Sequence, residues 1–244
     1  MLVHESLPGS WSSIWGDITG TQPALDRGAT LLCGVVALLV VVVPQLWRVG
    51  RHVVTIAHEG AHGVAALLAG RRLSGIRLHS DTSGLTVSKG RPTGPGMIAT
   101  AFAGYVGPAL VGLGAAYLLG RQHALAVLWL VVVLLGLLLL QIRNFYGLYA
   151  VLVAGVAVFA VSWWGSGDVQ AVTACTGTWF LLLAAPRPVL ELQAQRRRGQ
   201  ARTSDADVLA RLTPLPGLVW IGIFLVVTGG CLTLGAAWLL GAAA

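Results

Sequence analysis

The chain has 244 residues, of which 56% are apolar and only 10% are charged, and its formal net charge is +7. Soluble domains carry roughly 25% charged residues, so this composition excludes a soluble globular protein. The basic residues gather in short stretches between long apolar runs. We therefore interpret them as topology signals beside a lipid bilayer and expect no nucleic-acid partner.

The first 28 residues form a polar N-terminal segment that we expect to lie at the membrane interface. They carry Glu5, Asp17 and Asp26 and lack the basic start and apolar core of a cleaved signal peptide. Residues 29–240 then form one integral membrane domain.

Apolar segments follow at 29–47, 52–70, 97–119, 123–142, 145–164, 169–186 and 216–240. A helix crosses a hydrocarbon core of about 30 Å with about 20 residues. The pattern therefore predicts an all-α, multi-pass membrane protein with about six or seven membrane helices. The segment 52–70 is shorter and less apolar than most of the others, so entering the bilayer only partway is an alternative for it.

Two polar stretches, 71–96 and 187–215, carry most of the basic residues. Four apolar segments separate them, so both fall on one side, and the positive-inside rule makes that side cytoplasmic. If 29–47 and 52–70 both span the bilayer, Arg48 and Arg51 lie outside, against the rule. The sequence therefore leaves the orientation of these two segments open.

The stretch 71–96 does not have a helical pattern. Residues 75–79 and 85–89 alternate apolar and polar side chains, and Asp81-Thr82-Ser83-Gly84 between them has the composition of a turn. This predicts a small cytoplasmic β-hairpin.

The motif His58-Glu59-Gly60-Ala61-His62 lies inside an apolar helix. Histidines four residues apart share one helix face, so both can reach one zinc ion. Glu59 can take a proton from a metal-bound water. Polar groups at membrane depth are costly and usually functional. The alternative is a structural cluster of buried histidines without metal.

A catalytic zinc takes three protein ligands and leaves one position for water. Asp205 and Asp207 are the main candidates for the third ligand, and Ser204 before them can cap a short helix. Alternatively, the two acids only stabilise the start of that helix. Asp81, with His79, is the next candidate, although an Asx turn suits it better. We interpret His52 as an interface residue.

The sequence resembles the site-2 proteases, the intramembrane zinc metallopeptidases, and in particular a compact bacterial branch. The resemblance spans about residues 29–240. It rests on the His-Glu-x-x-His helix, the stretch RRLSGIRLHSDTSGLTVSKG, the small-residue helix AFAGYVGPALVG with Gly107-Pro108, and the C-terminal SDADVLARLTPLPGLVW.

The resemblance implies that His58, His62 and a distant aspartate bind Zn²⁺ and that Glu59 activates water. It implies a bacterial inner (plasma) membrane location and substrates that are membrane helices of other proteins, such as anti-sigma-factor-like regulators. Many members place the third ligand in an Asn-x-x-Pro-x-x-x-Leu-Asp-Gly stretch, which is absent here. We therefore assign Asp205, with Asp207 as the alternative. A non-catalytic membrane protein that keeps the fold or the metal site is the competing hypothesis.

A substrate helix must unwind before its peptide bonds are exposed. We expect the hairpin to hold the unwound segment as an added strand through Ile76, Leu78, Leu85 and Val87. Asn144 is a candidate donor to the substrate or the oxyanion, and a helix-interface role is its alternative.

Overall fold

The computed structural model describes residues 11–199 and 204–241, with side chains from Trp15 onward. The beginning of the predicted N-terminal segment and residues 200–203 of the predicted 187–215 stretch lie outside the described residues. The elements are α1 (Trp11–Thr19), α2 (Arg27–Val42), α3 (Pro44–Leu68), β1 (Arg72–Leu78), β2 (Gly84–Lys89), α4 (Pro95–Gly120), α5 (Ala124–Leu139), α6 (Phe145–Trp164), α7 (Gly167–Ala184), α8 (Pro186–Arg197), α9 (Asp205–Leu212) and α10 (Gly217–Leu239).

The structure confirms an all-α, multi-pass membrane fold with one small β-hairpin. Among the described residues, four helical stretches are long and apolar enough to span a bilayer alone, namely α4, α6, the continuous α7–α8 stretch and α10. The bent pair α2–α3 makes a fifth if it is counted as one span, and α5 is a shorter apolar helix of 16 residues. The seven predicted apolar segments are thus all helical, but fewer of them are full spans.

The break between the first two apolar segments lies earlier than the sequence predicted. We expected it at residues 48–51, but α3 already begins at Pro44, and α2 and α3 meet at 99°. Proline lacks the backbone N–H and forces the residue before it out of helical geometry, and Val43 is extended accordingly. Arg51 therefore lies inside α3, where its guanidinium pairs with Glu191 of α8 at 2.7 Å.

The predicted stretch 187–215 is also more helical than expected. Most of it belongs to α8 and α9, because Pro186 starts α8 and Ser204 caps α9. Glu191 on α8 accepts hydrogen bonds from Trp47 Nε1 at 2.9 Å and Arg187 Nε at 3.1 Å. These contacts, together with Arg51, fix α8 against the first half of α3.

The hairpin folds back along α3 from its C-terminal end. Gly70, with φ of +72°, follows the end of α3 and turns the chain into β1. The side chains of Leu73 and Ile76 lie beside Gly63, and the Thr55 hydroxyl donates to the Thr82 carbonyl at the hairpin tip at 2.8 Å. The hairpin tip therefore lies beside α3 on the N-terminal side of His58, and β1 and β2 run alongside the His-Glu-x-x-His motif.

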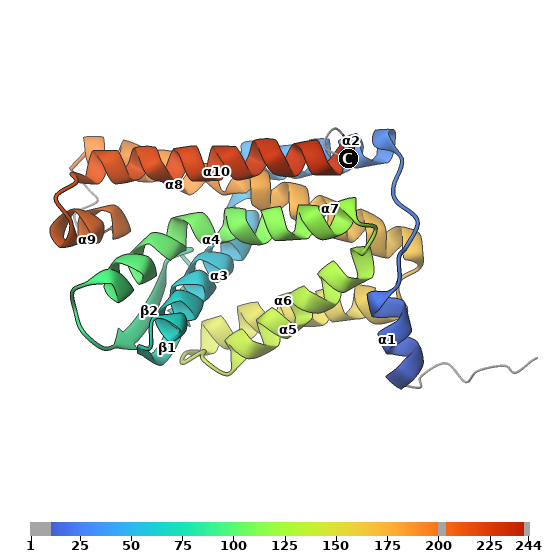
Figure 1. Cartoon of the computed structure of the whole chain (residues 1–244), viewed down its shortest axis with the longest axis horizontal. Helices are drawn as coiled ribbons and strands as arrows, with labels where there is room; N and C mark the ends of the chain where they lie inside the picture. Colours follow the sequence, from blue (N-terminus) through green and yellow to red (C-terminus); the bar gives the residue numbers. More distant parts are fainter. Residues whose placement is uncertain (1–10, 200–203, 242–244) are drawn as a thin grey trace, which may run out of the picture.

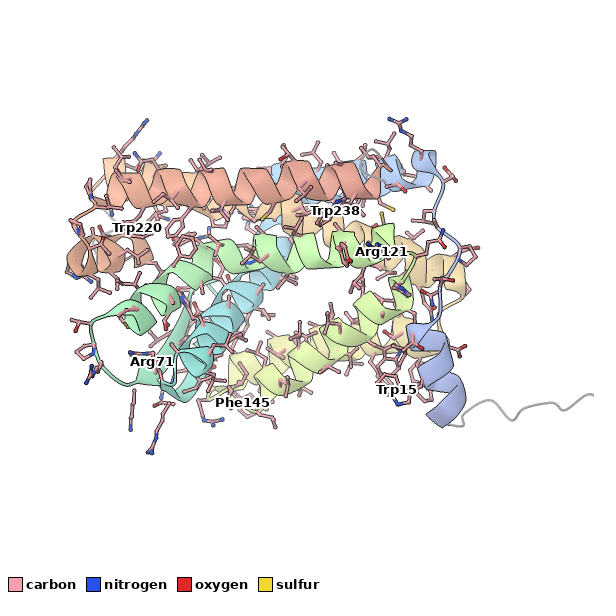
Figure 2. All side chains as sticks on the ribbon, in the orientation of Figure 1. Trp15, Arg71, Arg121, Phe145, Trp220 and Trp238 are labelled. Atoms are coloured by element: carbon pink, nitrogen blue, oxygen red, sulfur yellow. The ribbon has the colours of Figure 1, made fainter. Side chains whose placement is uncertain are left out.

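The two ends of the molecule differ in their elements. Figure 1 shows the hairpin and α9 at one end of the long axis and α1 with the C-terminal end of α10 at the other. The Gln22 amide donates to the Gln122 carbonyl at 2.8 Å, so the chain before α2 meets the α4–α5 turn. Because α4 runs from the hairpin to that turn, residues 20–22 lie at the end opposite the hairpin. Figure 2 places Arg71 and Phe145 at the hairpin end and Arg121 and Trp15 at the other.

Helix α4 is the centre of the bundle, with α3, α7, α9 and α10 packed against it. Small residues at its surface allow this: a Cβ on Gly107 would collide with Ala61 of α3, and one on Gly112 would lie 3.1 Å from Leu182 of α7. Small residues let membrane helices approach closely.

This arrangement predicts that residues 21 and 122 lie on one side of the membrane and residue 89 on the other. Thr21→Cys and Gln122→Cys in intact cells should react with a membrane-impermeant thiol reagent, whereas Lys89→Cys should react only after permeabilisation, because the positive-inside rule predicts that the basic end faces the cytoplasm. The native Cys33, Cys175 and Cys231 are buried and give little background. Labelling of residues 21 and 89 from the same side would contradict the fold.

Candidate metal and catalytic site

Helix α3 carries the His-Glu-x-x-His motif on its face toward α4 and the hairpin. Glu59 and His62 are buried, with 5% and 9% of their surfaces exposed. The His62 Nδ1 lies 2.7 Å from the Thr100 carbonyl of α4. An Nδ1–H that donates to this carbonyl leaves the Nε2 lone pair of His62 free for another partner.

Asp205 lies against both histidines, and Asp207 does not. The Asp205 Oδ2 is 3.3 Å from His58 Nε2 and 3.2 Å from His62 Nε2, and the two Nε2 atoms are 3.1 Å apart. Two histidines one helical turn apart and an aspartate distant from them in sequence thus direct one donor atom each to a common point.

The donor atoms fit a zinc ion in both chemistry and spacing. Two imidazoles and one carboxylate are a ligand set of catalytic zinc sites, and with metal–ligand bonds of about 2.0–2.1 Å a tetrahedron places its donors about 3.3–3.4 Å apart. The three separations in the cluster, 3.1 to 3.3 Å, are close to that edge. His58, His62 and Asp205 are therefore a group that could hold one metal ion.

Asp207 instead holds the start of α9 in place. Its carboxylate accepts from the Ser204 hydroxyl at 2.6 Å and the Ser204 amide at 3.2 Å, which completes a capping box, and it pairs with Arg196 of α8. Burial raises the pKa of Asp207, but the Ser204 hydroxyl and Arg196 outweigh it and lower the pKa below its usual value. Asp207 thus fixes the helix start from which Asp205 projects.

The pKa of Asp205 is lowered as well. Burial raises it, but hydrogen bonds and charge from His58 and His62 outweigh the burial. The carboxyl group is therefore an anion at neutral pH, the form that a metal ligand requires.

Glu59 points toward the hairpin. The Thr86 hydroxyl donates to Glu59 Oε2 at 2.6 Å and lies 3.1 Å from the Glu59 carbonyl. A Cβ on Gly84 would approach the Glu59 Cγ and Oε1 to 2.5 Å. Two residues of β2 therefore set the position of the carboxylate, and neither was singled out by the sequence.

Helix α4 contacts the histidine rings at Gly104, which has no side chain. A Cβ on Gly104 would collide with His62 and lie 2.7 Å from His58 Cε1. The Tyr105 ring meets His58 edge-on at a centroid distance of 4.9 Å. Gly104 and Tyr105 thus confine both imidazoles, and the sequence pattern did not single out either residue for the site.

The loop after α5 occupies the outer edge of β1. Ile76 N donates to the Gln141 carbonyl at 2.8 Å, and its own carbonyl accepts from Arg143 N at 2.9 Å. A Cβ on Gly75, whose φ is +143°, would collide with the Arg143 side chain. Asn144 extends this edge: it accepts from Leu78 N at 3.1 Å and donates to the Leu78 carbonyl at 2.7 Å. The amide of Asn144 is thus bound to β1.

The four predicted hairpin residues fall into two pairs. Ile76 and Leu78 are only 1% and 3% exposed and pack with Ile56, Leu138 and Ile142, whereas Leu85 and Val87 are 52% and 43% exposed. The expectation that Ile76 and Leu78 face a partner strand is therefore wrong, because their side chains form core and the backbone edge of β1 is already paired.

The free edge of the hairpin is β2. Ile76 pairs with Thr86 and Leu78 with Gly84, and both β1 residues direct their backbone groups away from β2. In an antiparallel ladder such a pair points its N–H and C=O groups outward on both strands. Gly84 and Thr86, the residues beside Glu59, therefore present their backbone groups at the open edge.

The remaining candidates lie apart from the cluster. The Asp81 carboxylate accepts from the Ser83 amide and hydroxyl at 2.9 and 2.6 Å, which is an Asx turn, and these bonds lower its pKa. His79 is exposed near Ser83. The His52 ring lies 3.3 Å from the Tyr146 hydroxyl of α6, which is an interface contact.

These features define a multi-pass membrane protein in which a His-Glu-x-x-His helix and a distant aspartate form one partly buried cluster. A family model described as Peptidase M50B-like matches residues 31–235. The chain therefore belongs to this peptidase family, which confirms the resemblance to the site-2 proteases. Comparisons with curated proteins and with solved structures find no match.

The contact of Gly104 with the histidines generates a test. Gly104→Ala should displace both rings and lower metal affinity by at least tenfold, measured by competition with a zinc chelator, and should lower stability by about 1–3 kcal/mol. Gly114→Ala in the same helix is the matched control, because a Cβ there meets nothing within 4 Å. Equal zinc affinity of the two variants would contradict the geometry.

Proposed function

We propose that the chain is an intramembrane zinc metalloendopeptidase that cleaves membrane-spanning segments of other proteins. The observation that carries the proposal is the triangle of His58, His62 and Asp205 donor atoms with Glu59 one residue from the first histidine. Membership of a peptidase family supports the reaction class.

In this proposal His58, His62 and Asp205 hold the metal and leave a position for water. A bound zinc supplies a Lewis acid that polarises the scissile carbonyl and lowers the pKa of water. Glu59 accepts the proton from the attacking water at its carboxylate and passes it to the leaving amine nitrogen. Thr86 holds one oxygen of this carboxylate, and the Thr100 carbonyl orients His62.

The unwound substrate lies along the free edge of β2 as an added strand. Backbone hydrogen bonds to Gly84 and Thr86 bring a peptide bond next to Glu59, whatever the side chains of the substrate are. Leu85 and Val87 offer exposed apolar contacts on the outward face. Asn144 supports this edge indirectly by holding β1, in place of the predicted contact with the oxyanion.

The substrate class follows from the location of the site. Several apolar helices surround it, so its natural substrate is another membrane protein in the same bilayer. An anti-sigma-factor-like regulator in a bacterial plasma membrane is the substrate and location that we propose.

Removal of the proposed base tests the reaction. Glu59→Gln keeps the size of the side chain but cannot accept the proton, so cleavage of a reporter transmembrane protein should fall by at least a hundredfold while bound zinc remains. Asp168→Asn, an exposed acid at the other end of the molecule, is the control and should cleave normally. A Glu59→Gln variant as active as wild type would sink the proposal, and a purified wild type without zinc would favour the non-catalytic alternative.

The third ligand can be tested separately. Asp205→Ala should lose stoichiometric zinc and activity, because it removes one of three donors. Asp207→Asn should keep the zinc and instead destabilise the start of α9 by about 0.5–2 kcal/mol. Metal analysis of both purified variants decides the assignment, and the reverse pattern would overturn it.

A further inference from the structure

The open end of the hairpin, where β1 begins and β2 ends, carries a pair of like charges. Arg72, the first residue of β1, lies directly opposite Lys89, the last residue of β2, and both are exposed. Like charges directly opposite on neighbouring strands destabilise a hairpin. A partner with the opposite charge would relieve this repulsion.

Two further cations extend the pair. The Arg71 Nε donates to the Ser88 hydroxyl at 3.0 Å, and its Nη1 donates to the Arg91 carbonyl, so this side chain lies across the strand ends. Arg91 itself is exposed. We call Arg71, Arg72, Lys89 and Arg91 the basic hairpin base, and Figure 2 shows Arg71 at this end of the molecule.

No carboxylate within residues 11–199 and 204–241 forms an ion pair with the basic hairpin base. The ion pairs there involve Arg51, Arg187 and Arg196 and the two motif histidines. The acid of the hairpin, Asp81, lies at the opposite tip and is bound to Ser83. Four positive charges therefore gather at one place without a described acidic partner.

The basic hairpin base continues the line of the free edge of β2. This strand passes Glu59 at Gly84 and Thr86 and reaches Lys89 three residues after Thr86. At about 3.3 Å per residue, the distance along the strand from Thr86 to Lys89 is about 10 Å. Leu85, Val87 and Lys89 share the outward face, so the edge presents two apolar contacts followed by a cation.

We propose that the basic hairpin base binds carboxylate side chains of the substrate, about three to five residues from the scissile peptide and on the hairpin side of the membrane. The inference rests on the proposed function, because it takes the β2 edge as the substrate strand. The fixed order of two apolar positions and one cation along this edge favours a peptide over lipid headgroups, which have no such order.

Binding to the Glu59→Gln variant in nanodiscs of zwitterionic phosphatidylcholine tests this without requiring cleavage. The probes are three fluorescent transmembrane peptides that differ only in a flanking Glu, Gln or Lys pair, and anisotropy reports their affinity. The Glu peptide should bind about threefold to tenfold tighter than the Gln peptide, and the difference should shrink as salt is raised.

Charge variants made in the same Glu59→Gln background locate the preference. Arg72→Gln with Lys89→Gln should abolish it, and Arg72→Glu with Lys89→Glu should reverse it in favour of the Lys peptide. Arg197→Gln with Arg198→Gln removes the same charge from exposed positions at the end of α8 and should leave it intact. The reversal separates a specific contact from a folding defect.

Two results would overturn the inference. One is a Glu preference that survives the loss of Arg72 and Lys89. The other is equal binding of all three peptides in phosphatidylcholine, together with an equal change in the affinity of all three when anionic phosphatidylglycerol is added. The basic hairpin base would then bind lipid. Failure of the wild type to cleave would sink the proposed peptidase but leave this preference measurable, so the two failures are distinguishable.

Discussion

The close approach of α4 to α3 is the constraint on which the rest of the structure depends. Gly107 faces Ala61, and Gly104 faces both motif histidines, so the backbone of α4 lies directly against α3 at these two positions. Within a bilayer, helices associate through close packing rather than through exclusion of water, and such small-residue contacts are therefore decisive. Helices α9 and α10 also pack on α4. The helix that positions the two histidines therefore also brings Asp205 of α9 to them.

Ionisable groups inside an apolar bundle are tolerated only with partners, and here each partner also sets an orientation. The Thr100 carbonyl turns the His62 ring, and the Thr86 hydroxyl turns the Glu59 carboxylate. Glu59 is held by the hairpin, while Asp205 comes from α9 on another part of the chain. The two carboxylates thus have separate supports, which suits the different roles that we propose for them, one as a base and one as a ligand.

Much of the fold and part of the site could be predicted from the sequence. Hydropathy indicated the helices, alternation indicated the hairpin, and the i, i+4 spacing indicated that His58 and His62 share a face. Hydropathy alone placed the end of the first apolar helix at Arg48, whereas Pro44, inside the predicted 29–47 segment, ends it. It also could not separate Asp205 from Asp207, since only the direction of each side chain from the first turn of α9 distinguishes them.

The hairpin illustrates the same limit and its consequence. Alternation makes Ile76, Leu78, Leu85 and Val87 look equivalent, but pairing with residues 141–144 closes one edge of the sheet and leaves the other open. This pairing joins segments more than sixty residues apart, and no local pattern encodes it. Once β1 is closed, the strand edge of the hairpin that has no partner among the described residues is the one that touches Glu59. The loop after α5 therefore contributes to the site without reaching it, because it determines where an extended chain can lie.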